Sequence, residues 1–79
     1  MTPEQAHQMI TDILREIAPD ADPETIGGDA DIREALELDS LDFLNFVEEL
    51  GKRSGRRIDE DDYPQLATLA SGAKFLTGP

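Results

Sequence analysis

The hydroxyl of Ser40 is well placed for chemistry, because it stands where an amphipathic helix is expected to begin. Asp39 precedes the helical pattern and can accept hydrogen bonds from the free N–H groups of the first turn, while Asp42 favourably meets the positive end of the helix dipole. Ser40 is then held at the helix start and faces water. A phosphate joined to it would lie beside unpaired N–H groups, which suits a covalently carried phosphodiester.

The helix that begins at Ser40 is predicted from apolar residues that recur at three- and four-residue steps. They are assigned to one helical face: Leu41, Leu44 and Val47, together with Phe43, Phe46, Val47 and Leu50. We expect this helix to run from Ser40 to Lys52 or Ser54, with Gly55 as its C-cap.

An Asp-Ser-Leu tripeptide taken alone favours simple helix capping, because Ser and Asp are both preferred caps. Its context favours another interpretation. The run Asp39-Ser40-Leu41-Asp42 resembles the phosphopantetheine attachment motif of acyl carrier proteins, and the similarity extends from the first helix through residues 29–36 to residues 58–61. The resemblance implies an all-α fold, a small right-handed four-helix bundle with three longer helices, one short helix and a long loop between the first two.

The resemblance also implies a function. Ser40 would carry a 4′-phosphopantetheine arm, donated by coenzyme A through a phosphopantetheinyl transferase, and the thiol of the arm would hold an acyl or aminoacyl group as a thioester. The carrier would not itself be an enzyme. It would present its cargo to loading ligases, synthases or acyltransferases of lipid, including fatty acid, or specialised metabolite synthesis. Basic patches on these partners would meet a docking face of Asp39, Leu41, Asp42, Asn45, Glu48 and Glu49.

Two of these docking acids have a second interpretation. Glu48 with Lys52, and Glu49 with Arg53, stand four residues apart in the favourable order. They are therefore also explained as ion pairs on a solvated helix face. Glu48 and Glu49 could serve both in docking and in intrahelical ion pairs, so both interpretations stay open.

Several positions depart from the usual pattern of acyl carrier proteins. Glu37 stands two residues before the Asp-Ser-Leu run, where glycine is common, and Asn45 stands five residues after Ser40, where carriers of fatty acid synthesis usually have Glu. Phe43 and Phe46 are bulkier than the usual residues. These departures suggest a specialised stand-alone carrier instead of a housekeeping carrier of fatty acid synthesis.

The composition limits size, partners and compartment. Seventy-nine residues predict a single domain, residues 1–79, with one small core. A net charge of −11 disfavours nucleic acid and anionic membranes, and it favours partners with basic surfaces. Neither a membrane span nor a signal peptide is recognised, so a cytoplasmic protein is expected. We also expect a monomer. The chain has no cysteine, and a thiol would have to come from an added group.

The first helix is predicted to begin after Thr2 as N-cap, with Pro3 at its first position and Gln5 completing a capping box, and to stop at Pro19. His7 has no second ligand nearby and is expected to be a solvated helix residue. The apolar face of this helix comprises Ala6, Met9, Ile10, Ile13, Leu14 and Ile17.

A long loop over residues 18–39 is predicted from its prolines, glycines and acids. A short turn is expected over residues 31–36. Loops of this length in a compact domain usually carry function or buried anchors. The expected anchors are Ile26, Ile32, Leu36 and Leu38.

Two shorter helical segments complete the predicted bundle. Asp59 is expected to cap a single turn that ends near Tyr63, since the next residue is proline. Thr68 is expected to cap a last helix, in which Gly72 is costly unless close packing requires it. The apolar positions of the last helix are Leu69, Ala73 and Leu76, with Phe75 alongside. Gly78-Pro79 is interpreted as a frayed tail.

Two alternatives to a carrier are a calcium-binding helix pair and a small acidic interaction module without cargo. Asp20, Asp22 and Glu24 fall at the first three odd positions of a calcium loop. The sixth position is Thr25, where the sharp turn requires glycine, and the twelfth is Asp31 instead of a bidentate Glu. No metal site is therefore predicted.

Overall fold

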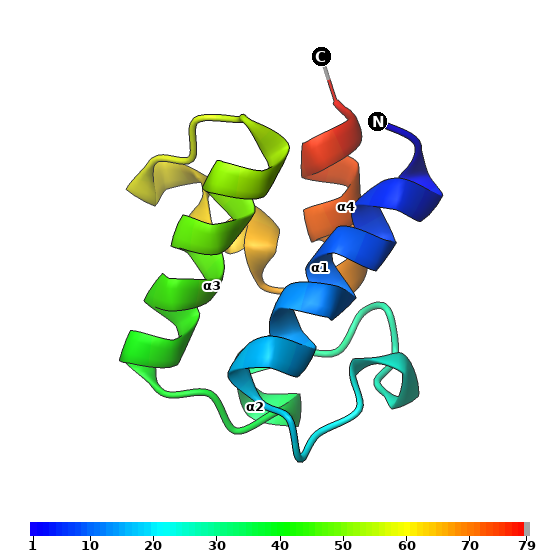
Figure 1. Cartoon of the computed structure of the whole chain (residues 1–79), viewed down its shortest axis with the longest axis vertical. Coiled ribbons are helices and arrows are strands. Elements are labelled where there is room, and N and C mark those ends of the chain that lie inside the picture. The colour runs from blue at the N-terminus through cyan, green and yellow to red at the C-terminus, as the bar shows by residue number, and fades with distance from the viewer. Residues whose placement is uncertain (79) are drawn as a thin grey trace.

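The computed structural model describes residues 1–78, and every regular element in that part of the chain is helical. The longer elements are α1 (Pro3–Ile17), α3 (Ser40–Ser54), η2 (Glu60–Leu66) and α4 (Leu69–Thr77), and the short ones are η1 (Pro23–Thr25) and α2 (Ile32–Ala35). In Figure 1, α1 and α4 lie side by side, α3 packs along α1, and α2 lies at the end opposite to the two termini. The predicted all-α bundle is confirmed.

The two long helices begin and end where the sequence predicts. The Thr2 hydroxyl accepts from the Gln5 N–H at 3.1 Å, and the Gln5 side chain accepts from the Thr2 N–H at 2.9 Å, which is the predicted capping box. Helix α1 ends at Ile17 with Ala18 as its C-cap, directly before Pro19. Helix α3 ends at Ser54, and Gly55 is left-handed with φ 69°, a conformation that glycine adopts without strain.

The core forms from α1, α3, α4 and the anchors of the long loop. Of the predicted anchors, Ile32, Leu36 and Leu38 are buried, and Ile26 packs partly buried against the same core. Thr11 is also fully buried, which the apolar spacing of α1 did not predict. Its hydroxyl donates to the Gln8 carbonyl oxygen at 3.1 Å, so this polar group is satisfied inside α1.

Gly72 allows α1 and α4 to approach closely. A methyl group built at Gly72 would lie 3.1 Å from Cδ1 of Ile10, which is tighter than ordinary van der Waals contact. Both residues are buried. The cost of glycine inside α4 is therefore explained by packing, as predicted.

The segment after Asp59 differs from its prediction. It is a 3₁₀ helix, η2, that passes through Pro64 to Leu66 instead of a single turn ending near Tyr63. The fixed φ of proline suits 3₁₀ geometry, so Pro64 does not end the segment. Asp59 is the N-cap residue as expected, and its N–H donates to the carboxylate of Asp62 at 3.0 Å.

The predicted frayed tail is wrong for Gly78. Its N–H donates to the Lys74 carbonyl oxygen at 2.9 Å, which caps α4. Its own carbonyl oxygen accepts from Nη2 of Arg56 at 2.6 Å, and the Arg56 guanidinium lies 5.4 Å from the ring centroid of Phe75. Pro79 lies outside the described residues. No helix among residues 1–78 is long and apolar enough to cross a membrane.

Candidate functional site

Ser40 is the first residue of α3, and its hydroxyl does not cap the helix. The cap is Asp39, whose carboxylate accepts from the Asp42 N–H at 2.8 Å. Ser40 is exposed, and its Oγ accepts a hydrogen bond from Nη2 of Arg33 at 3.3 Å. Simple helix capping therefore does not account for this serine. The structure leaves its hydroxyl free for other chemistry.

Helix α2 holds Arg33 beside Ser40. Asp31 caps α2 by accepting from the Glu34 N–H at 3.1 Å, and the buried side chain of Ile32 anchors the helix in the core. The Ile32 N–H also donates to the Ala67 carbonyl oxygen at 2.8 Å, which ties α2 to the segment between η2 and α4. These contacts hold α2 in the position from which the Arg33 side chain reaches Ser40 on α3.

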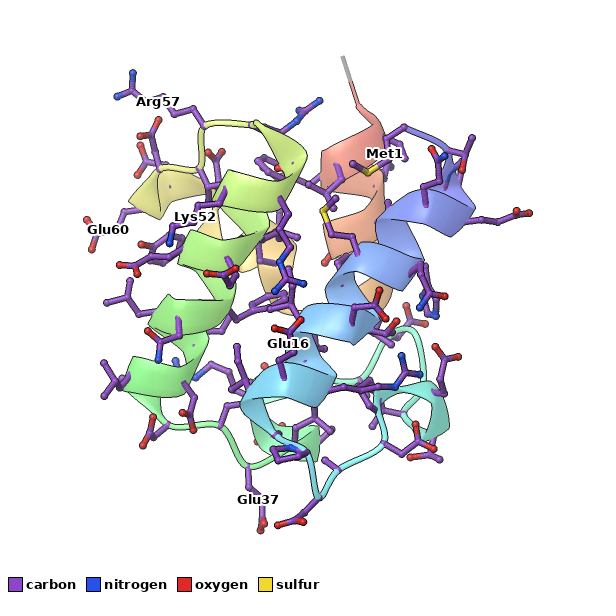
Figure 2. The ribbon with its side chains drawn as sticks, in the orientation of Figure 1. Met1, Glu16, Glu37, Lys52, Arg57 and Glu60 are labelled. Carbon is purple, nitrogen blue, oxygen red and sulfur yellow. The ribbon has the colours of Figure 1, made fainter. Side chains whose placement is uncertain are left out.

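Glu37 links α2 to α3 in a left-handed conformation with φ 55°. This conformation is strained for residues that carry a Cβ, and glycine adopts it freely. The departure noted in the sequence, Glu where glycine is common, therefore falls on a position whose backbone favours glycine. Figure 2 shows Glu37 at the lower end of the molecule, with its side chain pointing away from the body.

A cleft of about 430 Å³ opens beside Ser40, between the first half of α3 and η2. Phe43 and Tyr63 meet in it edge to face, with their ring centroids 5.9 Å apart. Its lining residues are Asp31, Arg33, Ser40, Phe43, Leu44, Tyr63, Pro64 and Ala67. Most of these side chains are apolar, whereas Asp31, Arg33 and Ser40 supply polar groups, which is the usual make-up of a small-molecule site.

Leu41 and Leu44 do not join the core face of α3, and this part of the sequence prediction is wrong. Leu41 is 65% exposed and Leu44 is 41% exposed, whereas Leu50 is fully buried. At 3.6 residues per turn, Leu41 points about 160° away from Phe43, and Leu44 about 100° away. The sequence prediction therefore combined two different faces of α3, the exposed face of Leu41 and Leu44 and the buried face of Phe43. Leu44 becomes a surface residue at the edge of the cleft.

The six predicted docking residues fall into two groups. Leu41, Asn45 and Glu48 are exposed and follow one another at i, i+4 and i+7 on a single face. The other three are less available to a partner. Asp39 caps the helix, and Asp42 is half-buried. Glu49 accepts a hydrogen bond from Nε of Arg53 at 3.2 Å. The predicted ion pair of Glu49 with Arg53 is confirmed, whereas the predicted pair of Glu48 with Lys52 is wrong, because Lys52 lies 3.6 Å from Glu49 instead.

The acids of the suspected calcium loop are used for local structure. The Asp22 carboxylate accepts from the Glu24 N–H at 3.0 Å and caps η1. The Glu24 carboxylate lies 3.3 Å from Nε2 of His7 and 3.4 Å from Nη2 of Arg15. Within residues 1–78, no group of three or more His, Asp or Glu side chains could hold a metal ion.

Comparison with known proteins identifies the family of the chain. Residues 8–76 match the family described as "Phosphopantetheine attachment site", so the chain belongs to that family. It is also similar to a protein named "Acyl carrier protein" from Lactobacillus johnsonii, with 29% identity over 76 residues that cover 96% of this chain and 94% of that protein. No solved structure matches the chain significantly. The prosthetic group of this family of carriers is 4′-phosphopantetheine.

Of the residues that line the cleft, only Ser40 was predicted from the sequence as a site residue. Arg33 and Tyr63 come from segments 7 and 23 positions away from Ser40, so no local pattern connects them with it. Leu44 was assigned to the same helical face as Phe43 and Phe46. For Leu44 a signal was available, since plotting α3 at 100° per residue separates it from Phe43, Phe46 and Leu50.

Proposed function

We propose that Ser40 is the attachment site of 4′-phosphopantetheine and that the chain carries an acyl or aminoacyl group as a thioester on this arm. One observation carries the assignment. Asp39 caps α3 alone, which leaves an exposed Ser40 hydroxyl at the mouth of an apolar cleft. The group fits the residues present, because α3 offers the positive end of its dipole and Arg33 offers a cation. When bound, the arm supplies a thiol that the chain itself lacks.

Attachment needs a transferase because no carboxylate or histidine among residues 1–78 forms a hydrogen bond with the Ser40 hydroxyl. The Ser40 oxygen attacks the β-phosphate of coenzyme A, a new O–P bond forms, and the pyrophosphate bond breaks to release adenosine 3′,5′-bisphosphate. The hydroxyl proton must pass to a base. Arg33 is the side chain that contacts Ser40, and an arginine guanidinium does not accept a further proton or lose one in proteins. A phosphopantetheinyl transferase would provide the base, and the carrier itself is not an enzyme.

The cleft is the proposed shelter for the cargo. Its walls, Phe43, Leu44 and Tyr63, would remove apolar surface of a bound acyl group from water. Each buried CH₂ group contributes about 0.8 kcal/mol, so a few carbons would already favour the sheltered position. A volume of about 430 Å³ suits a small acyl or aminoacyl group.

The exposed leucines of α3 are the proposed anchors of partner enzymes. Leu41 and Leu44 present apolar surface directly after Ser40, and Asp42 and Glu48 add negative charge near them. Apolar anchors supply affinity at such interfaces, whereas the surrounding charges mainly set the association rate. Asn45 leaves this face with one charge fewer than carriers of fatty acid synthesis usually have, which supports a specialised role.

Modification by a transferase tests the assignment. Wild type incubated with coenzyme A, magnesium and a promiscuous phosphopantetheinyl transferase should gain the mass of one phosphopantetheinyl group, and Ser40→Ala should gain none. Circular dichroism should show that Ser40→Ala remains folded, because the Asp39 cap is intact. Wild type that stays unmodified by a transferase proven active on another carrier would overturn the proposal.

Ser54 and Ser71 are internal controls for this experiment. Both are half-buried, and both hydroxyls have partners: Ser54 accepts from the Arg56 N–H at 3.2 Å, and Ser71 shares a hydrogen bond of 2.7 Å with Thr68. Neither should be modified. A Ser40→Ala chain that still gains the mass would therefore also contradict the proposal.

A further inference from the structure

Arg33 is held in place by two contacts at the mouth of the cleft. Its Nη2 donates to Ser40 Oγ at 3.3 Å, and its guanidinium carbon lies 5.4 Å from the ring centroid of Phe43. A guanidinium above an aromatic face is attracted by the ring, so Phe43 orients the group as well as lining the cleft. Because Phe43 is also packed against Tyr63, the cation rests on a supported aromatic pair.

The charge of Arg33 has no carboxylate partner among residues 1–78. Four other basic side chains form ion pairs with acids: Arg15, Lys52, Arg53 and Arg57. Arg33 forms none, although 18 acidic residues are present against 7 basic ones. An acidic chain thus keeps an unpaired cation next to the Ser40 hydroxyl. That arrangement is suited to an anion that arrives at this oxygen.

We propose that Arg33 binds the phosphate of the arm and ties it to α2 at the mouth of the cleft. This inference rests on the proposed attachment at Ser40. The phosphorus would be one bond away from the oxygen that Nη2 already contacts, so its two free oxygens come within reach of the guanidinium. Arginine binds phosphate well because its planar fork can donate two parallel hydrogen bonds.

The contact of Arg33 with the phosphate would also reduce electrostatic repulsion at Ser40. Asp39 and Asp42 flank Ser40, and the chain as a whole carries −11, so an added phosphate meets repulsion. Arg33 offsets that repulsion at short range. Arg33 is therefore a positioning residue: it holds the first group of the arm beside Phe43, at the entrance of the cleft.

The test compares wild type with Arg33→Gln, Arg33→Lys and Arg57→Gln, each with and without the arm. Arg57→Gln is the matched control, because it removes the same charge from a side chain that is 88% exposed and lies at the opposite end of the molecule from Glu37 (Figure 2). Intact mass establishes loading of every variant. The readouts are the change in melting temperature on loading and the ³¹P transverse relaxation rate of the phosphodiester.

The melting shift is the melting temperature of the loaded protein minus that of the unloaded protein. If Arg33 binds the phosphate, this shift is about 4 °C lower in Arg33→Gln than in wild type, whereas in Arg57→Gln it is the same as in wild type. The ³¹P relaxation rate of Arg33→Gln falls toward that of a flexible phosphodiester, because the phosphate, although still bonded to Ser40, is no longer held against α2. Arg33→Lys shows an intermediate rate, since it keeps the charge and loses the fork. In wild type, added salt weakens both effects.

Two failures are distinguishable. If wild type gains no mass, the attachment at Ser40 is wrong, and this inference fails with it. If all variants are loaded but Arg33→Gln and Arg57→Gln give the same relaxation rate and the same melting shift, attachment stands and the role of Arg33 is overturned.

Discussion

The two sides of the bundle are built differently. Where α1 meets α4, Gly72 removes a side chain so that Ile10 can pack directly against the backbone, and the residues around it are buried. Where α3 meets η2, the space between the elements remains a cleft of about 430 Å³, and Leu44 at its edge is exposed. The side of α1 and α4 is closely packed at Gly72, whereas the side of α3 and η2 is left open beside Ser40.

The packing that stabilises this short chain and the cleft beside Ser40 therefore lie on different sides of the bundle. Close packing of α1 with α4 and α3 supplies the buried apolar area that 79 residues need to fold. The wall opposite α3 is a 3₁₀ helix that begins with three acids and contains a proline, and it joins the core through Leu66 and through its packing against α4.

The largest expected effect compares two leucines on α3. Leu50→Ala should lower the free energy of unfolding by about 2–5 kcal/mol, because the side chain is fully buried. Leu41→Ala should change it by no more than about 0.5 kcal/mol, since Leu41 is exposed. Urea unfolding followed by circular dichroism measures both. Equal losses would show that the Ser40 end of α3 is part of the core, against the comparison above.

A smaller effect is expected at Glu37, next to the site. Glu37→Gly should relieve left-handed strain of about 1–2 kcal/mol, offset in part by the greater freedom of glycine in the unfolded chain, for a net stabilisation of about 1 kcal/mol. Thermal unfolding measures the gain. Glu37→Ala is the control, because it removes the charge and keeps the Cβ. If the two substitutions stabilise equally, relief of charge repulsion is the cause and the backbone is not strained.

The smallest effect concerns the ion pair that joins α1 to α3. Arg53 donates to both carboxylate oxygens of Glu16, each at 2.8 Å (Figure 2 labels Glu16). The hydrogen bond from Arg53, aided by its charge, holds the pKa of Glu16 below its ordinary value despite some desolvation. A lowered folded-state pKa contributes stability that is fully present above the unfolded value of about 4.3 and is lost as pH falls through the folded value.

Glu16→Gln should therefore lower the melting temperature slightly at neutral pH, and its difference from wild type should vanish in acid. Glu48→Gln is the control, since Glu48 is exposed and forms no ion pair among residues 1–78. Melting curves between pH 7 and pH 2 measure the trend. A difference for Glu16→Gln that persists unchanged at the lowest pH would contradict this assignment.

Local features of the sequence determined most of the helical framework. The Thr2–Gln5 capping box, the Asp39 cap and the Gly55 terminus were all predicted correctly, because each depends on backbone groups three or four residues away. The Asp-Ser-Leu run likewise indicated the family, which the match over residues 8–76 confirmed. That Ser40 is the attachment residue remains a prediction.

Only the tertiary structure decided what surrounds Ser40. The contact of Arg33 with Ser40, the meeting of Phe43 with Tyr63 and the passage of η2 through Pro64 depend on how distant segments pack, and no sequence period encodes them. Leu44 was placed wrongly for a related reason: apolar spacing identifies residues that could be buried, but burial requires a neighbouring element on that side of the helix. At this end of α3 the neighbour leaves a cleft, and Leu44 remains at its edge.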